Sequence, residues 1–197
     1  MYNINEIFKS IQGEGPYAGH PAIFIRLAGC NMEPLCNFCD TDFGYRRRAS
    51  VDAIVQEVKQ LAEDKVKLVV ITGGEPFTQD LKDLIYFLAI DFTVQIETNG
   101  TIIPNHFASY WGSVDIVVSP KALPVDDAMK QRADAVKFVV KEGITPCTKD
   151  YTCPIYIQPM DEKDPVKNKK NQEWAVKLCL EYGYRLSLQL HKLLEIQ

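Results

Sequence analysis

The sequence predicts an α/β protein whose parallel strands form an open, partial TIM-like barrel. Six short runs rich in β-branched residues are continuously apolar, as expected for parallel strands covered on both faces. They occupy residues 22–27, 68–72, 93–98, 114–119, 135–140 and 155–158. Helical patterns separate them, so the order is β-α-β-α repeated about six times. Because a closed barrel has eight such units, the arrangement is either a partial barrel or an open twisted sheet.

Each connection supports this order. The apolar helical stripes are Ile54, Val58, Leu61 and Ala62 after a Ser50 N-cap, then Leu81, Leu84, Ile85 and Leu88, and finally Trp174, Leu178 and Tyr182 before a C-capping Gly183. Residues 126–132 are a further short helical candidate, and residues 185–190 can add an edge strand. The connection over residues 99–113 has no clear pattern.

The bulk properties narrow the class of protein. The chain has 197 residues, which is enough for one domain, spanning 1–197, with a sizeable core. A formal net charge of −4 gives no indication of nucleic-acid binding, and the basic run 46–48 is interpreted as a solvated loop or as an electropositive lip near an anionic site. The N-terminus lacks a signal pattern, and no run reaches the ~20 apolar residues of a membrane span. We therefore expect a cytoplasmic protein without a membrane partner.

Three cysteines follow the first strand within ten residues, at Cys30, Cys36 and Cys39. Three clustered thiols indicate a soft-metal site, and the lack of a fourth indicates an open coordination position for a substrate or cofactor. A zinc site with Asp40 as a fourth ligand is the alternative. Cys179 is interpreted as a small buried hydrophobe. For Cys147 and Cys153, a second metal or redox role and no role at all both stay open.

Polar or glycine-bearing segments follow the other strands. They are Gly73-Gly74-Glu75-Pro76, Asn99-Gly100-Thr101, Ser119-Pro120-Lys121 and Gln158-Pro159-Met160-Asp161. The carboxyl ends of parallel strands share one rim, so these segments are expected to build one site. The two glycines would let a ligand approach the backbone, and Glu75 would accept hydrogen bonds from an amine. Lys121 could reach a carboxylate.

Two further features precede or lie within the first strand. Gly13 and Gly15 bracket Glu14, and such a loop can present backbone amides to a planar polar ligand, with Gln12 or Glu14 adding hydrogen bonds. A plain glycine loop is the alternative. Arg26 sits in an otherwise apolar strand and needs an anionic partner, for which we favour a ligand over a protein group.

Together these motifs resemble the radical S-adenosylmethionine (SAM) enzymes and, more narrowly, the 7-carboxy-7-deazaguanine synthase family. The matching segments are SIQGEG (10–15), GHPAIFIRLAGC (19–30), CDT (39–41), ITGGEP (71–76), ETNGT (97–101), SPK (119–121), QPMD (158–161) and QLHK (189–192). They span nearly the whole chain. The family usually has three residues between its first two cysteines and this chain has five, so we expect an outward bulge around Pro34 that leaves the ligands in place.

The resemblance implies a radical SAM core with a defined set of ligands. Cys30, Cys36 and Cys39 would ligate a [4Fe–4S] cluster whose fourth iron binds SAM. The SAM site would comprise Phe38, Gly74, Ser119, Pro120, Lys121, Gln158, Pro159, Met160 and Asp161. The substrate, 6-carboxy-5,6,7,8-tetrahydropterin, would contact Ile11, Gln12, Gly13, Arg26, Thr72 and the C-terminal Gln197. Thr41 would ligate Mg²⁺.

The resemblance also implies the reaction. A 5′-deoxyadenosyl radical would start a ring contraction that yields 7-carboxy-7-deazaguanine with loss of ammonia, in queuosine and 7-deazapurine biosynthesis. A flavodoxin-like or other low-potential electron donor and a homodimer are the expected partners. The alternatives are a glycyl-radical-enzyme activase of the same superfamily and a zinc-binding module without catalysis.

Overall fold

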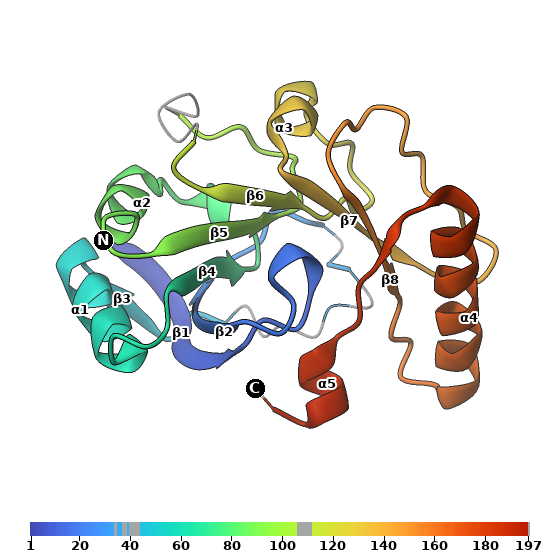
Figure 1. Ribbon diagram of the computed structural model, residues 1–197. Helices are drawn as coiled ribbons and strands as arrows, with labels where there is room; N and C mark the ends of the chain where they lie inside the picture. The colour runs from blue at the N-terminus through green and yellow to red at the C-terminus, as the bar shows by residue number, and fades with distance from the viewer. Residues whose placement is uncertain (34, 37–38, 40–43, 106–111, 197) are drawn as a thin grey trace.

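The computed structural model describes residues 1–33, 35–36, 39, 44–105 and 112–196, and over this part of the chain the strands form one open sheet (Figure 1). The strand order is β3-β1-β2-β4-β5-β6-β7-β8-β9. The parallel strands are β2 (Pro21–Leu27), β4 (Leu68–Gly73), β5 (Thr93–Thr98), β6 (Asp115–Val118), β7 (Ala135–Val140), β8 (Ile155–Pro159) and β9 (Arg185–Leu186). All six predicted strands are therefore confirmed, and the sheet does not close. The edge strand expected over residues 185–190 is confirmed only at Arg185–Leu186, because Leu190 begins a helix.

The two antiparallel strands at the other edge were not predicted. They are β1 (Tyr2–Ile11), which pairs with β2, and β3 (Arg47–Ala49), which pairs with β1. A register shift between Ile4 and Glu6 interrupts the two-residue alternation of β1, so its sequence shows no strand period. The interpretation of the basic run as a loop is wrong for Arg47 and Arg48, which are exposed positions of β3.

The predicted helices are present with the expected caps. They are α1 (Val51–Ala62), α2 (Lys82–Leu88), α3 (Asp127–Arg132) and α4 (Pro165–Tyr182), and a short α5 (Leu190–Leu194) was not predicted. Ser50 Oγ accepts a hydrogen bond from the Ala53 amide at 3.2 Å, and Gly183 ends α4 with φ of 74°. The predicted stripe of α4 is partly wrong, because its buried residues are Asn171, Ala175 and Leu178.

The main core lies between the sheet and the first three helices. Buried residues of α1, α2 and α3, among them Ile54, Leu84 and Met129, pack in one cluster with the apolar strand residues. A smaller cluster joins α4 to β7 and β8, and Cys179 is half-buried at its edge. In the described part of the chain, no helix has the length and apolarity that crossing a bilayer requires.

The carboxyl ends of β2 and β4 to β8 meet at one rim of the sheet, which is where the motif segments lie (Figure 1). After β9 the chain returns to the N-terminal glycine loop. There the Leu190 amide donates to the Gly13 carbonyl at 3.2 Å. The glycine loop and the segment after β9 therefore both reach the predicted site.

Candidate active site

One pocket of about 910 Å³ at this rim brings the predicted segments together. Cys30, Cys36 and Cys39 line it, and most of the predicted SAM residues do so as well, namely Gly74, Ser119, Lys121, Gln158, Pro159 and Asp161. Pro120 and Met160 are adjacent in the chain to these residues but do not line the pocket, and Phe38 lies outside the described residues. The expectation that separate strand ends build one site is confirmed as far as these residues go.

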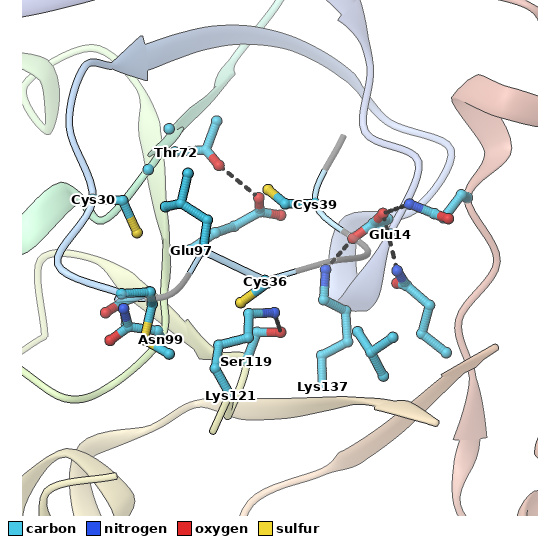
Figure 2. A pocket seen from close by; sticks show the side chains of 18 of the residues that line it. Glu14, Cys30, Cys36, Cys39, Thr72, Glu97, Asn99, Ser119, Lys121 and Lys137 are labelled. Carbon is cyan, nitrogen blue, oxygen red and sulfur yellow. Dashed lines mark hydrogen bonds and ion pairs between the residues drawn. The ribbon is translucent and has the colours of Figure 1, made fainter. Parts of the chain in front are cut away.

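The three cysteines lie around this pocket as partly buried free thiols (Figure 2). Within the described ranges, no three His, Cys, Asp or Glu side chains come together closely enough to hold a single metal ion. Three thiols spread around one pocket are a donor set that suits an iron–sulfur cluster, in which each thiolate ligates a different iron. Burial raises the pKa of the Cys36 thiol, and the nearby Lys121 ammonium opposes that rise.

The glycine pair Gly73-Gly74 fixes the position of the first cysteine. A Cβ on Gly74 would lie 1.9 Å from the Gly29 carbonyl oxygen and 2.8 Å from the Cys30 Cβ. At Gly73, φ is +139° and a Cβ would lie 2.2 Å from the Leu27 oxygen. The amide of Glu75 donates to the Gly29 carbonyl at 2.9 Å. These glycines therefore let the loop after β4 pack directly against the backbone that carries Cys30.

The Cys30–Cys36 loop turns inward where it begins. Asn31 accepts a hydrogen bond from the Asn99 side-chain amide and donates one to Thr101 Oγ1, both at 2.8 Å. Met32 is only 4% exposed and lines the pocket. Hydrogen bonds to Asn99 and Thr101, which follow β5, hold this part of the loop against the site, and the outward bulge around Pro34 stays a prediction. Pro34 lies outside the described residues.

The Glu75 side chain binds groups of the protein itself and does not face the predicted amine ligand. It is fully buried. Its carboxylate accepts hydrogen bonds from the Phe77 amide at 3.0 Å, from Thr98 Oγ1 at 2.7 Å and from the Asn99 amide at 2.7 Å. Burial raises the pKa of Glu75, and these hydrogen bonds oppose the rise. Because its oxygens are turned into the protein, the prediction of an amine contact is wrong.

Lys121 and Ser119 contact each other on the pocket wall. The Lys121 Nζ donates to Ser119 Oγ at 2.8 Å. Burial lowers the pKa of Lys121, and the nearby Lys137 ammonium lowers it further. Lys121 is therefore a partly buried residue of the pocket, not an exposed lysine on a turn. The pocket wall instead presents an ammonium group, which suits the carboxylate predicted there.

A second pocket of about 970 Å³ lies beside the first. Its lining includes all the described residues of the predicted substrate set, namely Ile11, Gln12, Gly13, Arg26 and Thr72. Gln197 and the predicted Mg²⁺ ligand Thr41 lie outside the described residues. Glu14, Thr72 and Glu97 line both pockets, so these three residues form a wall that the two pockets share.

Glu97 is the acceptor at the centre of this wall, and sequence reasoning assigned it no role. Its carboxylate accepts a hydrogen bond from Thr72 Oγ1 at 3.0 Å (Figure 2). It also accepts hydrogen bonds from Gln12 Nε2 at 3.0 Å and Gln95 Nε2 at 3.2 Å. His191, also unassigned, lines the second pocket and lies against Gly13. Both residues lie in segments that match the family, Glu97 in ETNGT and His191 in QLHK, and this match could have indicated a role for them.

Arg26 has a protein partner as well as access to the pocket. Its Nε lies 2.8 Å from Glu6 Oε1, and its guanidinium lies 5.4 Å from the centre of the Phe8 ring. Glu6 is on β1, which was not predicted, so its proximity could not be foreseen. The anionic partner that we attributed to a ligand is thus supplied at least in part by the protein, while Arg26 still lines the second pocket.

Comparisons with known proteins point to one enzyme family. The model of the radical SAM superfamily matches residues 24–150. The chain is 42% identical to the 7-carboxy-7-deazaguanine synthase of Rickettsia prowazekii, over 98% of this chain and 88% of that protein. It is 32% identical to the enzyme of the same name from Rhodospirillum rubrum, over 98% and 92%. The crystal structure of QueE from Escherichia coli is similar over 95% of this chain and 93% of that one, with a TM-score of 0.74 and 29% identity.

Proposed function

The chain belongs to the radical SAM superfamily and, within it, to the 7-carboxy-7-deazaguanine synthase family, and we propose that it converts 6-carboxy-5,6,7,8-tetrahydropterin to 7-carboxy-7-deazaguanine. The reaction is a radical ring contraction with loss of ammonia, which makes the enzyme a lyase of queuosine and 7-deazapurine biosynthesis. The observation that supports this substrate best is the pair of adjoining pockets, one lined by the three cysteines and the other by the glycine loop.

In the first pocket, Cys30, Cys36 and Cys39 would hold the [4Fe–4S] cluster that the family requires. When bound, the cluster and SAM supply a 5′-deoxyadenosyl radical, and the protein positions and shields the reacting groups. Lys121 and Ser119 provide an ammonium and a hydroxyl for the carboxylate of SAM. Gln158, Pro159 and Asp161 also line this pocket.

In the second pocket, the chain offers groups that match the two ends of a carboxypterin. Gln12 and Glu97 provide an amide and a carboxylate, which suit the amino and ring N–H groups of the pterin. Arg26 provides a guanidinium for the substrate carboxylate. The shared wall of Glu14, Thr72 and Glu97 lets the reacting carbon of the pterin lie next to the first pocket.

The remaining roles follow from the family. Thr41 would ligate a Mg²⁺ that also contacts the substrate, and Phe38 would lie near the adenine of SAM. Gln197, which lies outside the described residues, would contact the substrate. A homodimer, a flavodoxin-like or other low-potential electron donor, and a cytoplasmic location complete the proposal.

Anaerobic turnover tests this function. The reconstituted protein, with SAM, Mg²⁺, a reductant and 6-carboxy-5,6,7,8-tetrahydropterin, should form 7-carboxy-7-deazaguanine. Intact SAM cleavage without this product would contradict the substrate assignment and would favour the alternative function of a glycyl-radical-enzyme activase. A colourless protein that binds zinc but neither iron nor sulfide would support the zinc-binding module instead.

A further inference from the structure

A buried ion pair stands in the wall between the two pockets. It joins the Lys137 ammonium, on β7, to the Glu14 carboxylate in the glycine loop (Figure 2). The two side chains are only 8% and 13% exposed. Lys137 lines the pocket of the cysteines, and Glu14 lines both pockets. We propose that Lys137 is a positioning residue. It holds the glycine loop in place through Glu14 and thereby positions the pterin next to the pocket of the cysteines, which is called the SAM pocket below.

The contacts of Glu14 reach beyond this pair. Its carboxylate also accepts hydrogen bonds from Gln158 Nε2, at the end of β8, at 3.2 Å and from Gln189 Nε2, in the C-terminal segment, at 2.9 Å. Three elements distant in the sequence therefore meet at one carboxylate. Gln158 and Gln189 also line the SAM pocket, so a displacement of Glu14 changes that pocket as well.

The C-terminal segment also forms hydrogen bonds with the backbone of the glycine loop. The Gly15 amide donates to Ser187 Oγ at 3.0 Å, and the Leu190 amide donates to the Gly13 carbonyl at 3.2 Å. Gln12, the neighbouring residue, contacts Glu97 in the shared wall. The substrate loop, the shared wall and the C-terminal segment thus form one hydrogen-bonded unit, and the ion pair attaches this unit to β7.

A buried ion pair of this kind is not needed to stabilise the fold. Apolar residues of similar volume often replace a buried ion pair without loss of stability, whereas removal of one partner alone is strongly destabilising. The location of the pair gives a better reason. A reactive carbon radical must meet its target at short range, and a displacement of about 1 Å can reduce a rate about 100-fold. A fixed wall between the pockets meets this requirement.

The test compares K137M, K137R and the double variant E14Q/K137M with the wild type, each as the anaerobically reconstituted holoenzyme. K170M is the matched control, because Lys170 forms an exposed ion pair with Glu142, with a separation of 3.5 Å and exposures of 55% and 58%. Four quantities are measured: stability in urea, the Kd values for SAM and for the carboxypterin, the ratio of 5′-deoxyadenosine to 7-carboxy-7-deazaguanine, and hydrogen exchange at the Gly15 and Leu190 amides.

We expect K137M to lose stability, because Glu14 is left buried without its cation, and E14Q/K137M to regain most of it. Both variants should nevertheless bind the pterin at least about tenfold more weakly and release at least about tenfold more 5′-deoxyadenosine per product. The Kd for SAM should change less. K137R, which keeps the charge, should lie closer to the wild type, and K170M should match the wild type throughout.

Three results would overturn the proposal, two of them in the variants' binding and turnover and one in hydrogen exchange. A stable E14Q/K137M with wild-type pterin affinity and product ratio would make the pair merely structural, and K137R as impaired as K137M would show that the charge is irrelevant. The proposal rests on the proposed function, but hydrogen exchange tests it without substrate. Exchange at Gly15 and Leu190 should be about tenfold faster in K137M and E14Q/K137M than in the wild type. Unchanged exchange would refute the positioning role, whereas a wild type that makes no product would refute the function.

Discussion

The packing of Gly74 against the cysteine loop predicts that Gly74→Ala prevents normal cluster binding. A Cβ at this position would lie 1.9 Å from the Gly29 oxygen, whereas ordinary contacts begin at 3.4 Å, so the two backbones must separate by about 1.5 Å. The atoms that clash are backbone atoms and the Cβ of Cys30, so no side chain can rotate away to relieve the contact. Either Cys30 moves or the loop after β4 does.

The cost has two parts. Overpacking of this kind costs about 1–3 kcal/mol, and loss of the hydrogen bond from the Glu75 amide to the Gly29 carbonyl adds about 1 kcal/mol. The apoprotein should therefore lose about 2–4 kcal/mol, which corresponds to a decrease in Tm of about 4–16 °C for a domain of this size. Urea and thermal unfolding measure this loss, and iron and sulfide analysis after anaerobic reconstitution measures cluster binding.

The control is Gly143→Ala. Gly143 has φ of +81°, but a Cβ there would meet no atom within 4 Å, so only the backbone cost of about 1–2 kcal/mol applies. This variant should keep a full cluster. If Gly74→Ala also holds a full [4Fe–4S] complement and is as stable as Gly143→Ala, then the close approach of the two loops does not determine the position of Cys30, and the reasoning fails.

Three further predictions concern individual side chains. Arg26→Ala should raise the Kd for the carboxypterin about 10–100-fold and that for SAM much less; calorimetry that shows equal losses would count against the carboxylate role. Thr41→Ala should reduce the stimulation of turnover by Mg²⁺, and an unchanged Mg²⁺ titration would remove this residue from the metal site. For Asp161, hydrogen bonds from the Lys163 amide and from Lys192 and Asn168 lower the pKa from its usual 3.8 to about 2. Because the folded-state pKa is depressed, the stabilisation is complete above the usual value and is lost as the pH falls toward about 2. Urea unfolding should thus show a smaller loss of stability between about pH 4.5 and 2.5 for Asp161→Asn than for the wild type, and equal losses would disprove the assignment.

The parallel strands could be predicted because burial on both faces leaves a local signature, a run of apolar residues. Strand β1 leaves no such signature. Its register shift between Ile4 and Glu6 places two buried residues, Ile4 and Asn5, next to each other, so neither alternation nor a continuous apolar run appears. Strand β3 has three residues, two of them exposed arginines, and depends for its pairing on β1. The pairing between strands that are distant in the sequence therefore could not be predicted.

The same limit applies to the site. The thiols and the strand-end motifs could be predicted because their chemistry is local: residue type and spacing indicate the ligand. The acceptors Glu75 and Glu97 both belong to conspicuous motifs, yet the structure gives them opposite surroundings. Glu75 is buried against the end of β5, while Glu97 lines both pockets. Which carboxylate faces a ligand depends on the side of the strand end from which it projects, and motif composition does not report this.

The glycines of the SIQGEG segment show that a local motif can depend on residues distant in the sequence. Gly13 has an ordinary backbone conformation, but a Cβ there would lie 2.5 Å from His191 Nδ1 and 3.1 Å from the amides of Leu190 and His191. Gly15, with φ of +65°, is required by its own backbone. One glycine thus makes room for the C-terminal segment and the other shapes the turn, while Glu14 between them binds Lys137 and Gln189. Each pocket therefore contains residues of both the glycine loop and the C-terminal segment, so neither pocket is complete until these two segments pack against each other.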